Sequence, residues 1–191
     1  MKTQKLTAMS ILLALVIILQ LFATFIPMKP FAITLTLIPI VVGGALYGKK
    51  SGAFLGFAFT FVVLITYIMG ASAGGHMLWE SAPFLTAVIT LLRGTAAGFV
   101  SAGVYSLLKS KSTYFAGILA SIVCPIVNTG IFCLSMIFVF RDTLNAWSAG
   151  ADAIYYLIFS MVGINFLIEL SINVLLSPAI VRIIGIRQKN K

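Results

Sequence analysis

The chain is a succession of long apolar segments separated by short polar connections. Six of these segments come close to the roughly 20 residues that a helix needs to cross a lipid bilayer. They run over residues 6–26, 33–47, 52–69, 83–108, 115–140 and 153–184. The pattern predicts an all-α integral membrane protein with six transmembrane helices, in which residues 1–191 form a single membrane domain.

Three of the segments differ in how they are expected to sit in the membrane. The second segment is short and carries Pro39 in its interior, so we expect it to be kinked, tilted or partly re-entrant. The sixth is long enough to extend beyond the membrane or to bend near Pro178. The first is too long for a signal peptide and lacks a small-residue cleavage site, so we expect it to remain as the first membrane helix.

Composition and charge agree with a membrane protein. Hydrophobic residues make up 61% of the 191, charged residues only 9%, and the mean hydropathy is +1.13. A soluble domain would need more polar surface to cover such a core. With the N-terminus in the cytoplasm, the inner segments hold ten of the thirteen basic residues: Lys2, Lys5, Lys49, Lys50, Lys109, Lys111, Arg182, Arg187, Lys189 and Lys191.

This distribution of basic residues predicts that both termini are cytoplasmic, because Lys and Arg tend to remain on that side of the membrane. The formal charge of +9 is then explained by topology and by attraction to anionic lipid. The cations are spread over four short segments rather than gathered on one face, so nucleic acid is not an expected partner.

One stretch, VVGGALYGKKSG at residues 41–52, comes within one residue of a nucleotide-binding phosphate loop. Such a loop follows a strand and needs Ser or Thr where this chain has Lys50. Here the stretch ends a membrane segment and turns at the predicted cytoplasmic face. We therefore expect no nucleotide site here, and an ATP-driven process would need its ATP site on another chain.

Other catalytic and metal-binding patterns are weak. Cys124 and Cys133 lie nine residues apart on one predicted helix, which puts them on opposite faces, so they cannot bridge each other. A single histidine, His76, makes a zinc cluster implausible. Asp142 and Asp152 are the only aspartates and share one connection, which does not suit a metal-dependent phosphotransferase. We expect neither an enzyme nor a metal or cofactor site.

Polar residues within the predicted spans are the candidate ligand groups. They are Arg93 in the fourth span, Asn128 and Thr129 in the fifth, and Asn165, Glu169 and Asn173 in the sixth. The last three are spaced by four, so they line one stripe of a helix. A charge at mid-membrane costs about 2.5–3.5 kcal/mol unless it is paired or hydrated.

Two interpretations of these polar residues remain open. In the first, Arg93 and Glu169 pair with each other and have a structural role. In the second, Arg93 and the polar stripe line a substrate cavity that opens outward. The planar guanidinium of Arg93 suits a carboxylate, and the amide of Asn128 can both donate and accept hydrogen bonds.

Small residues four apart form a second pattern. They are Ser10 with Ala14, Gly52 with Gly56, and Gly94 with Gly98, and each pair would let another helix approach closely. For the two glycine pairs we expect ordinary packing inside the bundle. For Ser10 and Ala14 we expect a partner protein, for a reason that comes from resemblance.

Four stretches carry the resemblance: LTAMSILLALVIILQL, PFAITLTLIPIVVGGALYGKKSGAFLGF, LLRGTAAGFVSAGVY and NFLIELSINVLLSPAI. In this order and in a chain of this length, the sequence resembles the substrate-binding S components of the energy-coupling factor (ECF) vitamin transporters. The resemblance implies that the protein binds a vitamin from outside with high affinity. It also implies association with a membrane T component and two ATPases, and toppling in the membrane to release the ligand inside.

The resemblance also assigns residues. The family's first helix carries an Ala-x-x-x-Ala pair that contacts the T component, and Ser10 and Ala14 stand at the matching positions. The family's outer loops close over the ligand, which here implies residues 27–32 and a second lid at residues 74–81 with His76 and Trp79. Trp79 equally suits an interfacial anchor, because tryptophan favours the headgroup region regardless of function.

The stretches TLTLIPIVVGG, PIVNTGIF and NFLIELSIN are most similar to the pantothenate-specific members. A single intramembrane Arg suits pantothenate, a small flexible monoanion rich in hydroxyl and amide groups. Folate, riboflavin, hydroxymethylpyrimidine and queuosine-type bases remain alternative ligands. The rival from another class is a self-contained secondary carrier, although the halves 1–95 and 96–191 show no evident repeat of the kind many carriers have.

Overall fold

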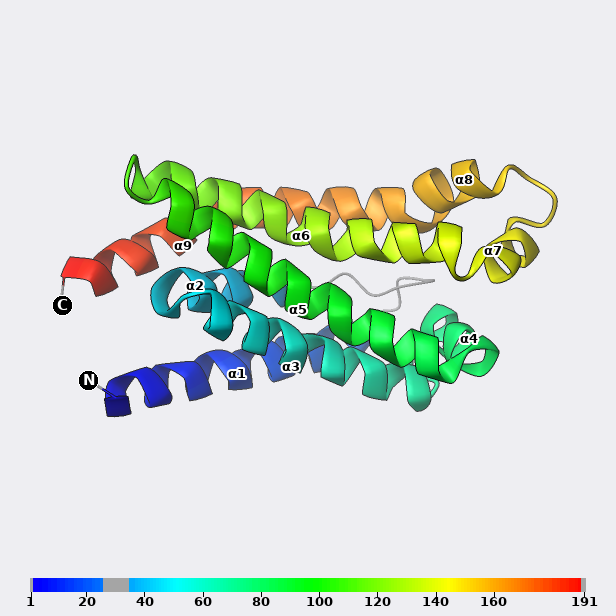
Figure 1. Cartoon of the computed structure of the whole chain (residues 1–191), viewed down its shortest axis with the longest axis horizontal. Coiled ribbons are helices and arrows are strands. Elements are labelled where there is room, and N and C mark those ends of the chain that lie inside the picture. Colours follow the sequence, from blue (N-terminus) through cyan, green and yellow to red (C-terminus); the bar gives the residue numbers. More distant parts are fainter. Residues whose placement is uncertain (1, 26–34, 190–191) are drawn as a thin grey trace.

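The structure is a computed structural model that describes residues 2–25 and 35–189, and every regular element in this part of the chain is helical (Figure 1). The elements are α1 (Lys2–Phe25), α2 (Leu37–Tyr47), α3 (Lys49–Ile68), α4 (Ala73–Ser81), α5 (Pro83–Leu108), α6 (Thr113–Phe138), α7 (Arg141–Ser148), α8 (Ala153–Tyr155), the π-helix η1 (Tyr156–Gly163) and α9 (Ile164–Lys189). The expected all-α fold is confirmed.

Five helical segments within the described ranges are long and apolar enough to cross a membrane. They run over Thr3–Thr24, Lys49–Ile68, Pro83–Leu108, Thr113–Phe138 and Ala153–Arg182. These correspond to the first, third, fourth, fifth and sixth predicted spans, and the fourth has the predicted bounds. The second predicted span contains only the shorter helix α2, so the count of six crossings stays a prediction.

Helix α2 lies inside the bundle, where it packs against α1, α3, α5, α6 and α9. Its residues from Leu37 to Gly44 are almost all buried. The helix begins at Leu37, so Pro39 stands in its first turn rather than in its interior. In that position the missing N–H of proline has no intrahelical partner to lose, so Pro39 is compatible with a regular helix.

The two ends of the bundle differ in what they carry. Both ends of the chain lie at one end, together with the α2–α3 and α5–α6 turns, whereas α4, α7 and α8 lie at the other (Figure 1). The first end therefore carries the basic residues Lys5, Lys49, Lys50, Lys109, Lys111 and Arg182. Chain ends on the same side are what an even number of crossings requires.

The α2–α3 turn shows what VVGGALYGKKSG does. Gly48 joins the two helices with a φ of 92°, a left-handed conformation that favours glycine. Its N–H donates to the carbonyl oxygen of Gly44, and its own carbonyl accepts from Ser51 and Gly52. The stretch is thus a tight turn between two helices, and it lacks the strand that precedes a phosphate loop.

A seam of four glycines joins α3 to α5. A methyl group at Gly52 would overlap the carbonyl oxygen of Gly98, and one at Gly98 would overlap that of Gly52. Gly56 and Gly94 face each other in the same reciprocal way. The expectation that the two glycine pairs serve packing inside the bundle is confirmed, and the seam fixes how α3 and α5 align.

The last helical segment departs from regular α-helix at η1, and α9 continues through Pro178 as one helix. The apolar run Ala153–Arg182 has 30 residues, which corresponds to about 45 Å of helix against a hydrocarbon core of about 30 Å. The segment is therefore long enough to extend beyond the membrane, as expected. Both cysteines are free, with Cys124 buried and Cys133 partly buried.

Candidate substrate-binding site

The site is built around one inward-facing stripe of α5. Thr86, Thr90, Arg93 and Ala97 follow one another at spacings of three or four residues, so they share a face of the helix. Arg93 is ten residues from the start of α5, which places its Cα about 15 Å from the α4 end of the bundle. Helical side chains tilt toward the N-terminus of their helix, so the guanidinium extends toward that end.

Two aromatic residues hold the guanidinium of Arg93. Its Nη2 donates a hydrogen bond of 3.1 Å to the hydroxyl of Tyr67 on α3, and its carbon lies 5.4 Å from the ring centre of Phe132 on α6. Another nitrogen of the same guanidinium, Nε, is buried and has no hydrogen-bond partner. A buried, unpaired donor on a charged group is costly, and a ligand acceptor would satisfy it.

A small cavity lies beside this guanidinium. It is lined by Tyr67, Leu78, Thr86, Ile89, Thr90, Arg93, Phe132, Ser135 and Phe140. The lining thus combines one cation and three hydroxyl-bearing residues of α5 and α6 with an apolar wall. The cavity has about 10 Å³ of room, which is enough for one water molecule.

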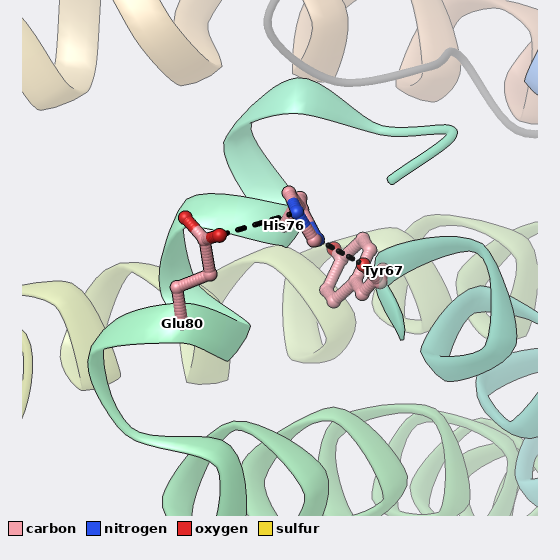
Figure 2. A network of polar contacts seen from close by, with 3 residues as sticks. All are labelled: Tyr67, His76 and Glu80. Atoms are coloured by element: carbon pink, nitrogen blue, oxygen red, sulfur yellow. Dashed lines mark hydrogen bonds and ion pairs between the residues drawn. The ribbon is translucent and has the colours of Figure 1, made fainter. Parts of the chain in front are cut away.

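Tyr67 also connects the site to the short helix α4. Its backbone carbonyl oxygen lies 2.9 Å from Nδ1 of His76, and Nε2 of His76 lies 3.4 Å from a carboxylate oxygen of Glu80 (Figure 2). A methyl group added to Gly75 would overlap the ring of Tyr67, so α4 lies directly against that ring. Tyr67 itself is only 4% exposed.

The backbone partner of His76 indicates which ring nitrogen carries the hydrogen of a neutral imidazole. A carbonyl oxygen can only accept, so Nδ1 carries a hydrogen and donates it to Tyr67. In a neutral ring Nε2 would then present a lone pair to the carboxylate of Glu80. The contact with Glu80 is therefore favourable only when the imidazole is doubly protonated.

Helix α6 brings a second polar group to the same interior. Asn128 precedes Phe132 by one turn, so the two side chains share a face, and Asn128 lies about 6 Å further from the α4 end. Asn128 is 6% exposed, and its Oδ1 is buried without a hydrogen-bond partner. An unpaired buried amide oxygen is a place where a ligand donor would bind.

The polar stripe of the last span lies on α9, which packs against α6. Glu169 and Asn173 are both buried, and Nδ2 of Asn173 donates to the carbonyl oxygen of Glu169 at 2.8 Å. Oδ1 of Asn173 is buried without a partner. Asn165 lies partly buried in the first turn of α9. The stripe therefore faces the protein interior, as its spacing predicts.

The remaining predicted residues are distributed over the molecule. Trp79 on α4 and Thr129 on α6 are partly buried, whereas Ser10 and Ala14 are exposed on α1. The first lid, at residues 27–32, lies outside the described residues. The second lid, at residues 74–81, is the helix α4 rather than a loop.

Sequence reasoning missed the two aromatic residues that hold Arg93. Tyr67 stands at the end of the third span, where an aromatic residue is usually an interfacial anchor. Phe132 is one of fifteen phenylalanines and carries no distinguishing pattern. The only available signal was the spacing of Phe132 from Asn128, which places both on one helix face.

Taken with its apolar helices, this interior defines a multi-pass membrane protein with a partly polar, inward-facing site. Residues 4–181 match the family model of the ECF transporter substrate-specific component, and the chain belongs to that family. It is therefore the substrate-specific subunit of a transporter in the cell membrane. The chain is also similar to the pantothenic acid transporter PanT of Lactococcus lactis subsp. cremoris (strain MG1363), at 28% identity over 94% of this chain and 93% of that protein. No solved structure matches it.

Proposed function

We propose that the protein is the high-affinity pantothenate-binding subunit of an ATP-driven ECF importer. The observation that carries this proposal is the guanidinium of Arg93, whose buried Nε has no partner and which lies beside a small cavity that Thr86, Thr90 and Ser135 help to line. Pantothenate offers one carboxylate together with hydroxyl and amide groups. The similarity to a pantothenic acid transporter over nearly the whole chain supports the same ligand.

In this proposal each polar residue has a chemical role. Arg93 binds the carboxylate through charge-assisted hydrogen bonds, which are stronger than those between neutral groups. Oδ1 of Asn128 accepts a hydrogen bond from a hydroxyl or amide of the ligand. The remaining polar side chains beside the ligand come from α6 and α9, and they are Thr129, Asn165 and Glu169.

The ligand is larger than the present cavity, so binding requires movement. About 10 Å³ holds one water molecule, whereas pantothenate has 15 non-hydrogen atoms. We propose that α4 is a lid, because it joins α3 to α5 by short connections and supplies Leu78 to the cavity wall. His76 and Trp79 then belong to this lid beside Leu78, and residues 27–32 form the other lid.

The partners follow from the family. We propose that the exposed pair Ser10 and Ala14 on α1 contacts the membrane T component, since small residues allow a close helix approach. Two cytoplasmic ATPases supply the energy, because the corner at Gly48 is not a nucleotide site. The end of the bundle that carries the basic residues and both chain ends is cytoplasmic, and α2 completes a sixth crossing.

The test is titration of the purified protein in detergent with pantothenate and with its alcohol analogue, in which CH2OH replaces the carboxylate. Wild type should bind pantothenate more tightly than the alcohol. Arg93→Ala should weaken pantothenate binding by about 10–150-fold, the equivalent of 1.5–3 kcal/mol for a hydrogen bond to a charged group. Arg93→Lys is the matched control, since it keeps the charge but loses the planar fork.

If well-folded wild-type protein showed no binding in the pantothenate titration, pantothenate would be excluded as the ligand. Mass spectrometry of the small molecule that copurifies with the protein would then distinguish folate, riboflavin, hydroxymethylpyrimidine and queuosine-type bases. An unchanged dissociation constant for Arg93→Ala would remove Arg93 from the site. Transport by the isolated protein in liposomes, without a T component or ATPases, would favour a secondary carrier instead.

A further inference from the structure

Tyr67 stands at the point where three helices of the proposed site meet. Its hydroxyl accepts from Arg93 on α5, and its carbonyl oxygen accepts from His76 on α4 (Figure 2). Its ring lies against Gly75 so closely that no side chain fits there. Tyr67 therefore links Arg93 to α4 through two hydrogen bonds.

The meeting of Tyr67 and Arg93 depends on the direction of their helices. Gly56 on α3 faces Gly94 on α5, so Tyr67 lies eleven residues, or about 16 Å, further along the axis than this pair. The two helices run in opposite directions (Figure 1). Because side chains tilt toward the N-terminus of their own helix, Tyr67 and Arg93 extend toward each other and span that separation.

This arrangement leaves one part of the guanidinium free for a ligand. Phe132 covers a face of the guanidinium, and Tyr67 takes one of the two hydrogens on Nη2. The buried Nε–H has no partner, and Nη2 carries a second hydrogen besides the one that it donates to Tyr67. Two neighbouring N–H groups of this kind bind a carboxylate through parallel hydrogen bonds.

We propose that Tyr67 is a positioning residue that makes the site selective for a carboxylate. Its hydroxyl fixes the rotation of the Arg93 guanidinium so that the Nε side faces the cavity. Its ring is kept in place by Gly75 of α4. Tyr67 therefore contacts both the lid helix and the guanidinium that binds the carboxylate. The choice of pantothenate as ligand rests on the proposed function, whereas the orientation of Arg93 rests on geometry alone.

The variant that tests this is Tyr67→Phe, which keeps the ring against Gly75 and removes only the hydroxyl. Pantothenate should bind about five- to tenfold more weakly, as expected when the guanidinium keeps its charge and one hydrogen bond of ordinary strength is lost. The alcohol analogue should bind as it does to wild type, because it lacks the carboxylate that would pair with the Nε–H and Nη2–H groups of Arg93. A merely structural role for Tyr67 would weaken binding of both compounds, and that result would overturn the proposal.

A double-mutant cycle tests whether Tyr67 acts through Arg93. In an Arg93→Ala background, Tyr67→Phe should leave the dissociation constant for pantothenate unchanged, because the group that it positions is gone. Independent, multiplicative effects of the two substitutions would overturn the proposal. Tighter pantothenate binding by Tyr67→Phe alone would also overturn it, since the hydroxyl would then compete with the ligand.

A measurement without ligand separates this proposal from the identity of the vitamin. The chain has four arginines, so nitrogen-15 labelling of arginine gives few Nε signals, and the one lost in Arg93→Lys belongs to Arg93. That signal should shift in Tyr67→Phe because the guanidinium loses its support. An unchanged Arg93 signal would overturn the positioning role even if pantothenate binds, and a shifted signal would support it even if another vitamin is the ligand.

Discussion

The glycine seam between α3 and α5 should make the bundle sensitive to a single added methyl group at Gly56. A Cβ there would lie 2.7 Å from the carbonyl carbon of Gly94 and closer still to its oxygen, whereas ordinary contact begins at 3.4 Å. The obstructing atoms belong to backbone, so they cannot rotate away. The two helices must separate by at least about 0.7 Å, and packing along the seam is lost.

The expected loss of stability follows from two opposing terms. Overpacking of this kind lowers the free energy of unfolding by up to about 3 kcal/mol. The higher helix propensity of alanine raises it by about 1 kcal/mol. We therefore expect Gly56→Ala to lower the free energy of unfolding by about 2 kcal/mol. For a domain of this size that corresponds to a fall of about 4–8 °C in the apparent Tm.

A thiol-reactive fluorescent dye can report this unfolding in detergent, because the side chain of Cys124 is fully buried. The partly buried Cys133 is replaced by alanine in every variant, so that only Cys124 reports. Gly130→Ala on α6 is the matched control, since a methyl group there meets nothing within 4 Å and should leave the apparent Tm equal or higher. Equal apparent Tm values for Gly56→Ala and wild type would refute the seam as a close-packed contact.

Three further predictions use other parts of the molecule. Asn128→Leu should abolish pantothenate binding without lowering the apparent Tm, because it removes a buried amide oxygen that has no partner; a large fall in Tm would assign Asn128 to packing instead. Ser10→Trp should reduce copurification with the T component and leave pantothenate binding intact, whereas Ile11→Trp, also exposed but about 100° around α1, should leave both unchanged; loss of binding in Ser10→Trp would place that face in the ligand cavity. Ala149→Gly should stabilise the protein by up to about 1 kcal/mol in the same thermal assay, since Ala149 has a φ of 49°, and a lower Tm would contradict this strain argument.

The helices were largely predictable because their signal is local. An apolar run of about 20 residues is a property of consecutive residues, and it gave the α5 bounds directly. The misjudged element was α2, whose Pro39 lies in the first turn rather than in the helix interior. Where a helix begins depends on which backbone groups its neighbours satisfy, and hydropathy carries no information about that.

Some candidate residues could be predicted because a polar group costs free energy when it is buried in an apolar segment. Arg93 and Asn128 stand out because a charge or an amide within an apolar span must find a partner. The sequence could not give the depth of Arg93 or the direction in which it points. It also gave no indication of Tyr67, to which Nη2 of Arg93 is bonded, or of Phe132, whose ring lies against the guanidinium.

The sequence by itself determined that the chain is a helical membrane protein with an apolar exterior and a few polar residues facing inward, because hydropathy and helical periodicity are local properties. Only the tertiary structure decided that Tyr67, Arg93 and Phe132 meet, since they come from three different helices. Their meeting depends on the register and opposite directions of α3 and α5. That register is set by the reciprocal contact of backbone atoms at four glycines, which no pattern within a single helix specifies.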